Sequence, residues 1–178
     1  MISSGEARLV LQARAGDREA LERLLSGIQS RLLGYISGVV DRTAADDVLQ
    51  ETFLQICRNL NWLRDPELFM PWAYRIASRA CFKFLKHASR FTSIEERSIV
   101  VDEVASVSQP ELHLFCSMPG LLEKISAASR AVLNLHYVQD LPIQEVAAIL
   151  EIDIGTAKSR LAYGLTCLRK IVNEKENL

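Results

Sequence analysis

The residues best suited to chemistry lie near the end of the chain, on a segment that carries cations and no acids. Between positions 154 and 170 the only charged residues are Lys158, Arg160, Arg169 and Lys170. Guanidinium and ammonium groups donate charge-assisted hydrogen bonds to phosphate oxygens and can also reach base edges. Side chains of this kind bind a polyanion rather than break a covalent bond, so they indicate a nucleic-acid partner.

Two helices joined by a tight turn must position these cations. The first, over about 142–150, has one apolar face at helical spacing, formed by Ile143, Val146, Ala147 and Leu150. Pro142 suits a first helical position, and Asp153 can cap the second helix over about 154–173. The pattern is typical of a helix-turn-helix, whose second helix fits the major groove of a duplex. A plain helical hairpin with a solvated basic face is the alternative.

A second basic ridge lies on a helix predicted over about 71–89. Steps of three or four positions keep five cations on one side of it: Arg75, Arg79, Lys83, Lys86 and Arg90. Aromatic residues gather near its N-terminal end: Trp62, Phe69, Trp72 and Tyr74. Rings stack on unpaired bases while cations hold phosphates, so this combination favours single-stranded nucleic acid over a merely solvated face. A parallel stripe is predicted to be core: Trp72, Ile76, Ala80 and Phe84.

A helix predicted over 46–60 has the opposite charge. Its apolar stripe consists of Val48, Leu49, Thr52, Phe53, Ile56 and Leu60. The face away from that stripe carries Asp46, Asp47, Gln50 and Glu51. Acids near a helix N-terminus complement the helix dipole, which is the simpler interpretation. The sharper interpretation is a docking face for a basic or amide-rich protein.

Overall composition conceals these surfaces. The 178 residues are 49% hydrophobic and carry a formal net charge of −1, which predicts a folded chain without an obvious polyanionic partner. Charge is segregated along the sequence, however. Positions 75–90 hold five cations and no acid, whereas positions 91–111 hold five acids against Arg97 alone.

The sequence predicts an all-α fold. Further helices are expected over about 4–15, 17–40 and 121–138, with a connection over 41–45 and a loop over 61–71. Residues 91–117 break the helical pattern, apart from a short helix expected near 111–116. We therefore expect two small helical domains, 1–90 and 118–178, loosely coupled by a flexible acidic linker over 91–117, the C-terminal domain being the helix-turn-helix.

Other classes of protein find little support. The four cysteines, Cys57, Cys81, Cys116 and Cys167, are far apart, which predicts free thiols, no metal site and no disulfide framework. The three histidines have no partner at ligand or triad spacing, and no P-loop, GxGxxG, HExxH or GxSxG motif occurs. We expect no enzyme activity and no cofactor. No signal peptide and no 18-residue apolar run are present, so we expect no membrane insertion and a cytoplasmic location.

Three segments together resemble a known family. DDVLQETFLQICRNL, PWAYRIASRACFKFL and LPIQEVAAILEIDIGTAKSRLAYGLTCLR are similar, in this order and at about this separation, to the extracytoplasmic-function (ECF) group of bacterial RNA polymerase sigma factors. The resemblance covers nearly the whole chain apart from the linker. Two separate motif blocks are far more specific than a helix-turn-helix alone.

The resemblance implies an alternative sigma factor that binds core RNA polymerase and directs promoter recognition, DNA melting and transcription initiation. Its implied partners are core polymerase, promoter DNA and an anti-sigma factor, with no obligate homo-oligomer. Core polymerase would be bound by Asp46, Asp47, Gln50, Glu51 and Phe53. The −10 element would be bound by Trp72, Tyr74, Arg75, Arg79, Lys83 and Lys86. The −35 element would be bound by Thr156, Lys158, Ser159, Arg160, Tyr163 and Arg169.

Four positions depart from the family pattern. Arg79 stands where an amide often helps to hold a flipped −10 base, and Glu151 replaces the glycine of the turn. Tyr163 stands where Arg is frequent, and Ala157 where Val is common. A promoter sequence therefore cannot be borrowed from a relative. Two other classes stay open: an operator-binding helix-turn-helix regulator that acts without polymerase, and a helical adaptor whose basic ridges bind acidic proteins.

Overall fold

The computed structural model describes residues 4–89 and 125–176, with side chains to Lys170. All regular elements within these ranges are helical, so the predicted all-α class is confirmed there. The predicted linker and its short helix near 111–116 lie outside the described residues. Within the described ranges no helix is both long and apolar enough to cross a membrane.

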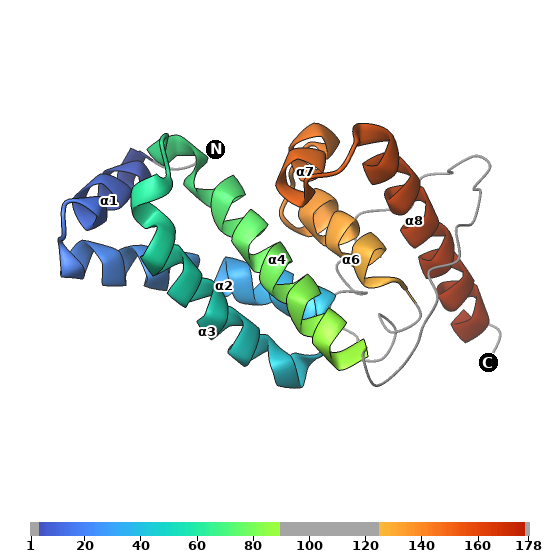
Figure 1. Cartoon of the computed structure of the whole chain (residues 1–178). Helices are drawn as coiled ribbons and strands as arrows, with labels where there is room; N and C mark the ends of the chain where they lie inside the picture. The colour runs from blue at the N-terminus through green and yellow to red at the C-terminus, as the bar shows by residue number, and fades with distance from the viewer. Residues whose placement is uncertain (1–3, 90–124, 177–178) are drawn as a thin grey trace.

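Four helices build the N-terminal half: α1 (Ser4–Arg14), α2 (Arg18–Val39), α3 (Arg42–Asn59) and α4 (Phe69–Ser89) (Figure 1). The carboxylate of Asp17 begins α2 as predicted, because its Oδ1 accepts a hydrogen bond from the Ala20 N–H at 3.0 Å. The apolar stripe of α2 is buried, with Leu24, Ile28 and Leu32 at its centre. The predicted loop over 61–71 instead contains two short 3-10 turns, η1 (Leu60–Trp62) and η2 (Pro66–Leu68).

The start of α3 was wrongly predicted. The segment 41–45, expected to be a connection, is helical from Arg42 onward. Ala44 and Ala45 are buried against the core, so tertiary packing extends the helix by one turn at its N-terminus. Asp41 occupies the cap position without a side-chain cap bond.

The core stripe of α4 was only partly predicted. Trp72, Ile76 and Ala80 are half-buried and pack against the core, whereas Phe84 is exposed. The face that is buried is formed by Phe69, Met70, Ala73, Tyr74, Ala77, Ser78 and Cys81. Small residues on this face let the helix pack closely on its neighbours, so the larger side chains lie at the edge of the core.

The C-terminal half contains α6 (Ala127–Leu133), a π-helical turn η4 (Asn134–Val138), α7 (Ile143–Leu150) and α8 (Ile154–Glu176). The pair α7 and α8 is the predicted helix-turn-helix, with Pro142 at the cap position rather than first in the helix. Glu151 ends α7 in the left-handed region, at φ 56° and ψ 45°, and its N–H bonds to the Ala147 carbonyl. This C-terminal cap conformation favours glycine. The turn therefore forms as predicted without glycine, and Glu151 adopts a conformation to which it is less suited.

The sequence predicts two loosely coupled halves, but in the structure the two halves pack together. Figure 1 shows α4 between the N-terminal helices and the C-terminal group, and it contacts α2, α3 and α7. Residues of both halves share one hydrophobic core, to which the C-terminal half contributes Ala131, Val132, Leu135, Val146 and Ile149. Polar contacts add to it: the Arg130 guanidinium donates to the Val39 carbonyl, at the C-terminal end of α2, at 2.7 Å.

Candidate polymerase and nucleic-acid interfaces

The acidic face of α3 lies on the surface. Asp46, Asp47 and Gln50 are exposed, while Val48 and Leu49 beneath them are buried. This inward–outward division follows directly from helical spacing, and it leaves two carboxylates and an amide available to a protein partner.

A short polar ladder continues along the same helix. Glu51 is half-buried and its Oε1 accepts a hydrogen bond from Gln55 Nε2 at 2.9 Å. The Asn59 amide in turn donates to the Gln55 carbonyl at 2.8 Å. Such i, i+4 contacts hold the Glu51 carboxylate in one place. Phe53 is half-buried beside this face.

Sequence reasoning missed Leu54 as part of this surface. Its side chain is 51% exposed on α3. A large apolar residue that falls outside the buried stripe was the available signal. The face thus combines acids with apolar side chains, a composition that suits protein docking.

The basic ridge of α4 is only partly available. Arg79, Lys83 and Lys86 are exposed, and Trp72 and Arg75 are half-buried. The aromatic cluster at its start divides: Trp62 is 81% exposed, whereas Phe69 is fully buried. Trp62 is therefore the ring of this cluster that is most open to stacking.

Tyr74 does not face solvent, contrary to its predicted role as a DNA-facing residue. Its ring meets that of Tyr35 edge-on, with 5.5 Å between the centroids, and its hydroxyl donates to the side chain of Gln139, the residue directly after η4. Burial raises the pKa of Tyr74 to about 12. The Tyr74 side chain therefore links the two halves. In this conformation neither face of its ring is open to a base.

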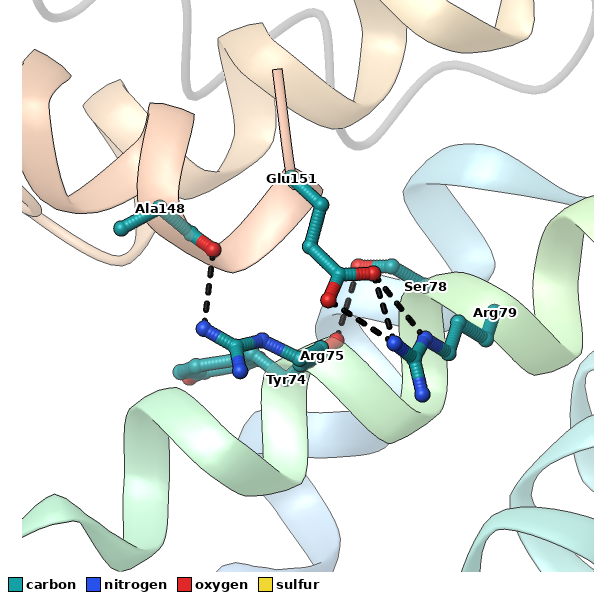
Figure 2. Close-up of polar contacts among 6 residues, drawn as sticks. All are labelled: Tyr74, Arg75, Ser78, Arg79, Ala148 and Glu151. Atoms are coloured by element: carbon teal, nitrogen blue, oxygen red, sulfur yellow. Dashed lines mark hydrogen bonds and ion pairs between the residues drawn. The ribbon is translucent and has the colours of Figure 1, made fainter. Parts of the chain in front are cut away.

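Two arginines of the ridge are occupied by the helix-turn-helix (Figure 2). Arg75 Nη2 donates to the carbonyl of Ala148 in α7 at 2.9 Å. Arg79 forms a two-pronged ion pair with the Glu151 carboxylate, with Nη2 2.7 and 2.8 Å from its oxygens and Nε at 3.2 Å. The arginine beside it holds the pKa of Glu151 below the ordinary glutamate value.

The recognition helix α8 presents a mixed surface. Lys158 and Ser159 are exposed near its start, and Ala157 and Leu165 are buried. The remaining predicted −35 residues are half-buried: Thr156, Arg160, Tyr163 and Arg169. The Tyr163 hydroxyl hydrogen-bonds the Cys167 thiol one turn later, and this bond together with burial raises the pKa of Tyr163. Lys158 and Ser159 are thus the side chains best placed for base edges.

Within 4–89 and 125–176, no three His, Cys, Asp or Glu side chains gather as metal ligands would. The fold and surfaces define a helical protein with two basic helices and a separate acidic face. Basic helices of this kind suit a polyanion, and a separate acidic face with exposed apolar side chains suits a protein partner.

Comparison with known proteins agrees with this class. Residues 19–91 match the family model of sigma-70 region 2, and residues 118–168 match that of sigma-70 region 4. The ECF RNA polymerase sigma-E factor of Haemophilus influenzae is 25% identical over 165 residues, covering 86% of this chain and 87% of the relative. RNA polymerase sigma factor CarQ of Myxococcus xanthus is 27% identical over 169 residues, covering 92% of this chain and 95% of CarQ.

Solved structures share the fold. CnrH, in complex with the cytosolic domain of CnrY, superposes with a TM-score of 0.68 at 22% identity, over 96% of this chain and 99% of CnrH. Sigma factor RpoE, in complex with the anti-sigma factor NepR from Bartonella quintana, gives 0.65 at 18% identity, over 85% and 96%. The chain belongs to the sigma-70 family of RNA polymerase sigma factors, in its ECF group.

Proposed function

We propose that the chain acts as an alternative sigma factor whose surfaces divide the work of initiation. The acidic face of α3 binds core RNA polymerase, through Asp46, Asp47, Gln50, Glu51 and Phe53. The region 1–90 reads the −10 element and 118–178 reads the −35 element. The observation that carries this proposal is the pairing, in one chain and in this order, of both sigma-70 regions with an exposed acidic face and two basic helices.

At the −10 element, we place Arg75, Arg79, Lys83 and Lys86 along the phosphates of the opened strand. The exposed ring of Trp62 supports this placement, because an unpaired base gains about 1–3 kcal/mol by stacking on such a ring. Trp72 lies at the N-terminal end of the ridge and is half-buried. Tyr74 contributes by positioning α4 rather than by touching DNA.

The chain itself supplies no bond-making chemistry in this proposal. Phosphoryl transfer belongs to the polymerase, and the sigma factor contributes binding and strand separation in the compartment where the polymerase works, the cytoplasm. An anti-sigma factor is a further proposed partner. Its support is the family membership together with the two structural relatives, each solved with a bound partner.

A binding titration with sigma-free core polymerase tests the assignment of α3. We expect Asp47→Lys and Glu51→Lys each to weaken the affinity for core at least about tenfold, because reversing a charge that becomes desolvated in an interface costs about 2–5 kcal/mol. Glu22→Lys is the matched control, since Glu22 is exposed on α2 and its ion pair with Arg18 lies in solvent.

Circular dichroism melts should be unchanged in all three variants, because the substituted side chains lie outside the core. Equal affinity of wild type and both α3 variants for core would remove this face from the interface. A wild-type chain that binds duplex DNA specifically but never binds core would favour the operator-binding alternative.

A further inference from the structure

Two departures from the family pattern contact each other. Arg79 replaces an amide on α4, and Glu151 replaces a glycine at the turn of the helix-turn-helix, 72 positions later. The structure joins these two side chains in the two-pronged ion pair of Figure 2. Neither side chain is needed to build the core, because Arg79 is 67% and Glu151 48% exposed.

Glu151 is a poor choice for the turn on local grounds. Its φ of 56° lies in the region that glycine adopts freely and other residues rarely do. The side chain also covers no core, because it is 48% exposed. Among the described residues its carboxylate forms an ion pair with Arg79 and lies in the field of Arg75, and these charge interactions offset the conformational cost.

The pair covers a DNA-binding surface. In this conformation the Glu151 oxygens sit on the Arg79 guanidinium where phosphate or base acceptors would bind, and the Ala148 carbonyl occupies Arg75. Carboxylate and phosphate are both two-pronged acceptors for arginine, so one excludes the other. Arg75 Nε is buried without an acceptor in the described part of the chain, so the closed contact leaves a donor unused.

The closed arrangement cannot read a whole promoter, if the proposed function holds. Elements named −35 and −10 lie about 25 base pairs apart, roughly 85 Å at about 3.4 Å per base pair. In the closed chain α7, next to the recognition helix, touches α4 directly. Residues 90–124 could span roughly 115 Å when fully extended, at about 3.3 Å per residue, so the chain length permits separation.

We propose that Glu151 is an internal latch: its carboxylate binds Arg79 in place of DNA and holds the two halves closed until core polymerase and promoter separate them. The effect of the latch on polymerase and promoter binding rests on the proposed function, whereas the closed contact itself does not. The buried contacts between the halves set the closed geometry, and the ion pair adds a salt-sensitive share of its stability.

Small-angle X-ray scattering of the free full chain tests closure without reference to function. Glu151→Gln and Glu151→Lys should increase the radius of gyration at about 0.05 M salt, with the lysine variant the larger because it adds repulsion from Arg75 and Arg79. Wild type should approach Glu151→Gln at about 0.5 M salt. Glu145→Gln is the control, since Glu145 is exposed on the same helix, makes no ion pair among the described residues and carries the same charge.

Binding to core polymerase tests the consequence. An exposed ion pair of this kind shifts an equilibrium by about two- to fivefold, so Glu151→Gln should tighten the apparent affinity for core by about that factor. Maximal transcription at saturating core should stay equal to wild type, because the latch is then already open.

The latch is wrong if Glu151→Gln and Glu145→Gln give the same radius of gyration as wild type at low salt. It is also wrong if Glu151→Gln lowers transcription at saturating core, because Glu151 would then serve the open state. Should wild type fail to bind core at all, the proposed function falls, while the scattering result still decides whether the latch exists.

Discussion

Arg79 has two partners in this account, and it can hold only one at a time. Its side chain is 67% exposed and its guanidinium lies 2.7 Å from the Glu151 carboxylate. In the proposed open state the same donors face the −10 strand. A substitution of Arg79 therefore affects both the closed contact and DNA opening. Substituting Glu151 as well separates the two effects.

We predict that Arg79→Ala lowers the yield of open complex by about tenfold while affecting closed complex less. One charge-assisted contact is worth about 1.5–3 kcal/mol, and this one forms with the separated strand. Permanganate reactivity of promoter thymines measures opening, and gel retardation at low temperature measures closed complex. Carrying the same change in a Glu151→Gln background removes the latch from the comparison. Equal losses in both complexes would reduce Arg79 to a simple phosphate contact.

For individual residues, the sequence predicted side-chain exposure well where helical spacing alone determines it. Asp46, Asp47 and Gln50 point outward because their neighbours at helical spacing point inward. Tyr74 shows where such reasoning stops. Its position beside Arg75 suggested a stacking ring, yet Tyr35, near the C-terminal end of α2, and Gln139, from the other half, enclose it. Contacts between residues so distant in sequence leave no local signal.

At the scale of elements, α8 is the helix whose placement matters most for promoter choice. Lys158 and Ser159 are exposed at its N-terminal end, where recognition helices meet base edges. Arg169 is half-buried and Lys170 exposed about three turns later, a position suited to the phosphate backbone. The two ends of one helix should therefore respond differently to loss of charge.

We predict that Lys158→Ala relaxes the preference at one −35 position, because a base-reading side chain contributes about 1–3 kcal/mol of discrimination. Arg169→Ala should weaken all promoters alike and reduce the salt slope by about one unit. Selection from a randomised −35 library with each mutant holoenzyme separates these outcomes. Lys170→Ala serves as an exposed comparison, since half-buried Arg169 also packs in the fold. An unchanged −35 consensus for Lys158→Ala would contradict the placement of α8 in the groove.

The positions of the helices were predicted well from the sequence, but the faces that they bury were predicted less well. Seven predicted helices correspond to described ones, because long amphipathic stretches carry a strong period. The early start of α3 and the buried face of α4 were missed for one reason. Both depend on alanines, Ala44, Ala45, Ala73 and Ala77, which are buried but too small to stand out in an apolar stripe.

At the scale of the whole molecule, the close approach of the two halves depends on Gly38. A Cβ built on Gly38 of α2 would lie 2.3 Å from the Asn134 amide of η4, far inside contact distance. Asn134 is buried and donates to the Gly34 carbonyl at 3.5 Å. This crossing joins α2 to η4 and shares no residue with the Arg79–Glu151 pair, so it offers a second, steric way to open the chain.

We predict that Gly38→Ala loosens the packing between the halves and costs about 1–3 kcal/mol of closed-state stability, the usual range for overpacking. Gly27→Ala is the matched control on the same helix, because no atom lies within 4 Å of its added Cβ. That change should stabilise the chain by about 0.5–1 kcal/mol through helix propensity. Thermal melts and scattering measure both. A compact, unaltered Gly38→Ala protein would show that the halves do not meet at this crossing.

How the halves meet could not be predicted from the sequence. Charge segregation and the break over 91–117 suggested two separate cores. The shared core instead includes Leu135, Val146 and Ile149, apolar residues that the two-domain prediction assigned to the C-terminal domain alone. An amphipathic pattern shows that one face of a helix is buried, but it does not show which part of the chain packs against that face.

The most direct test of the central claim is transcription by sigma-free core polymerase on a library of random promoter-length DNA, with start sites read by sequencing. With the purified chain added, we predict that transcripts arise from templates sharing two upstream sequence elements at a fixed spacing, and that neither chain nor core alone selects them. Transcripts with no shared elements, or no initiation above that of core alone from a folded chain, would contradict its action as a sigma factor.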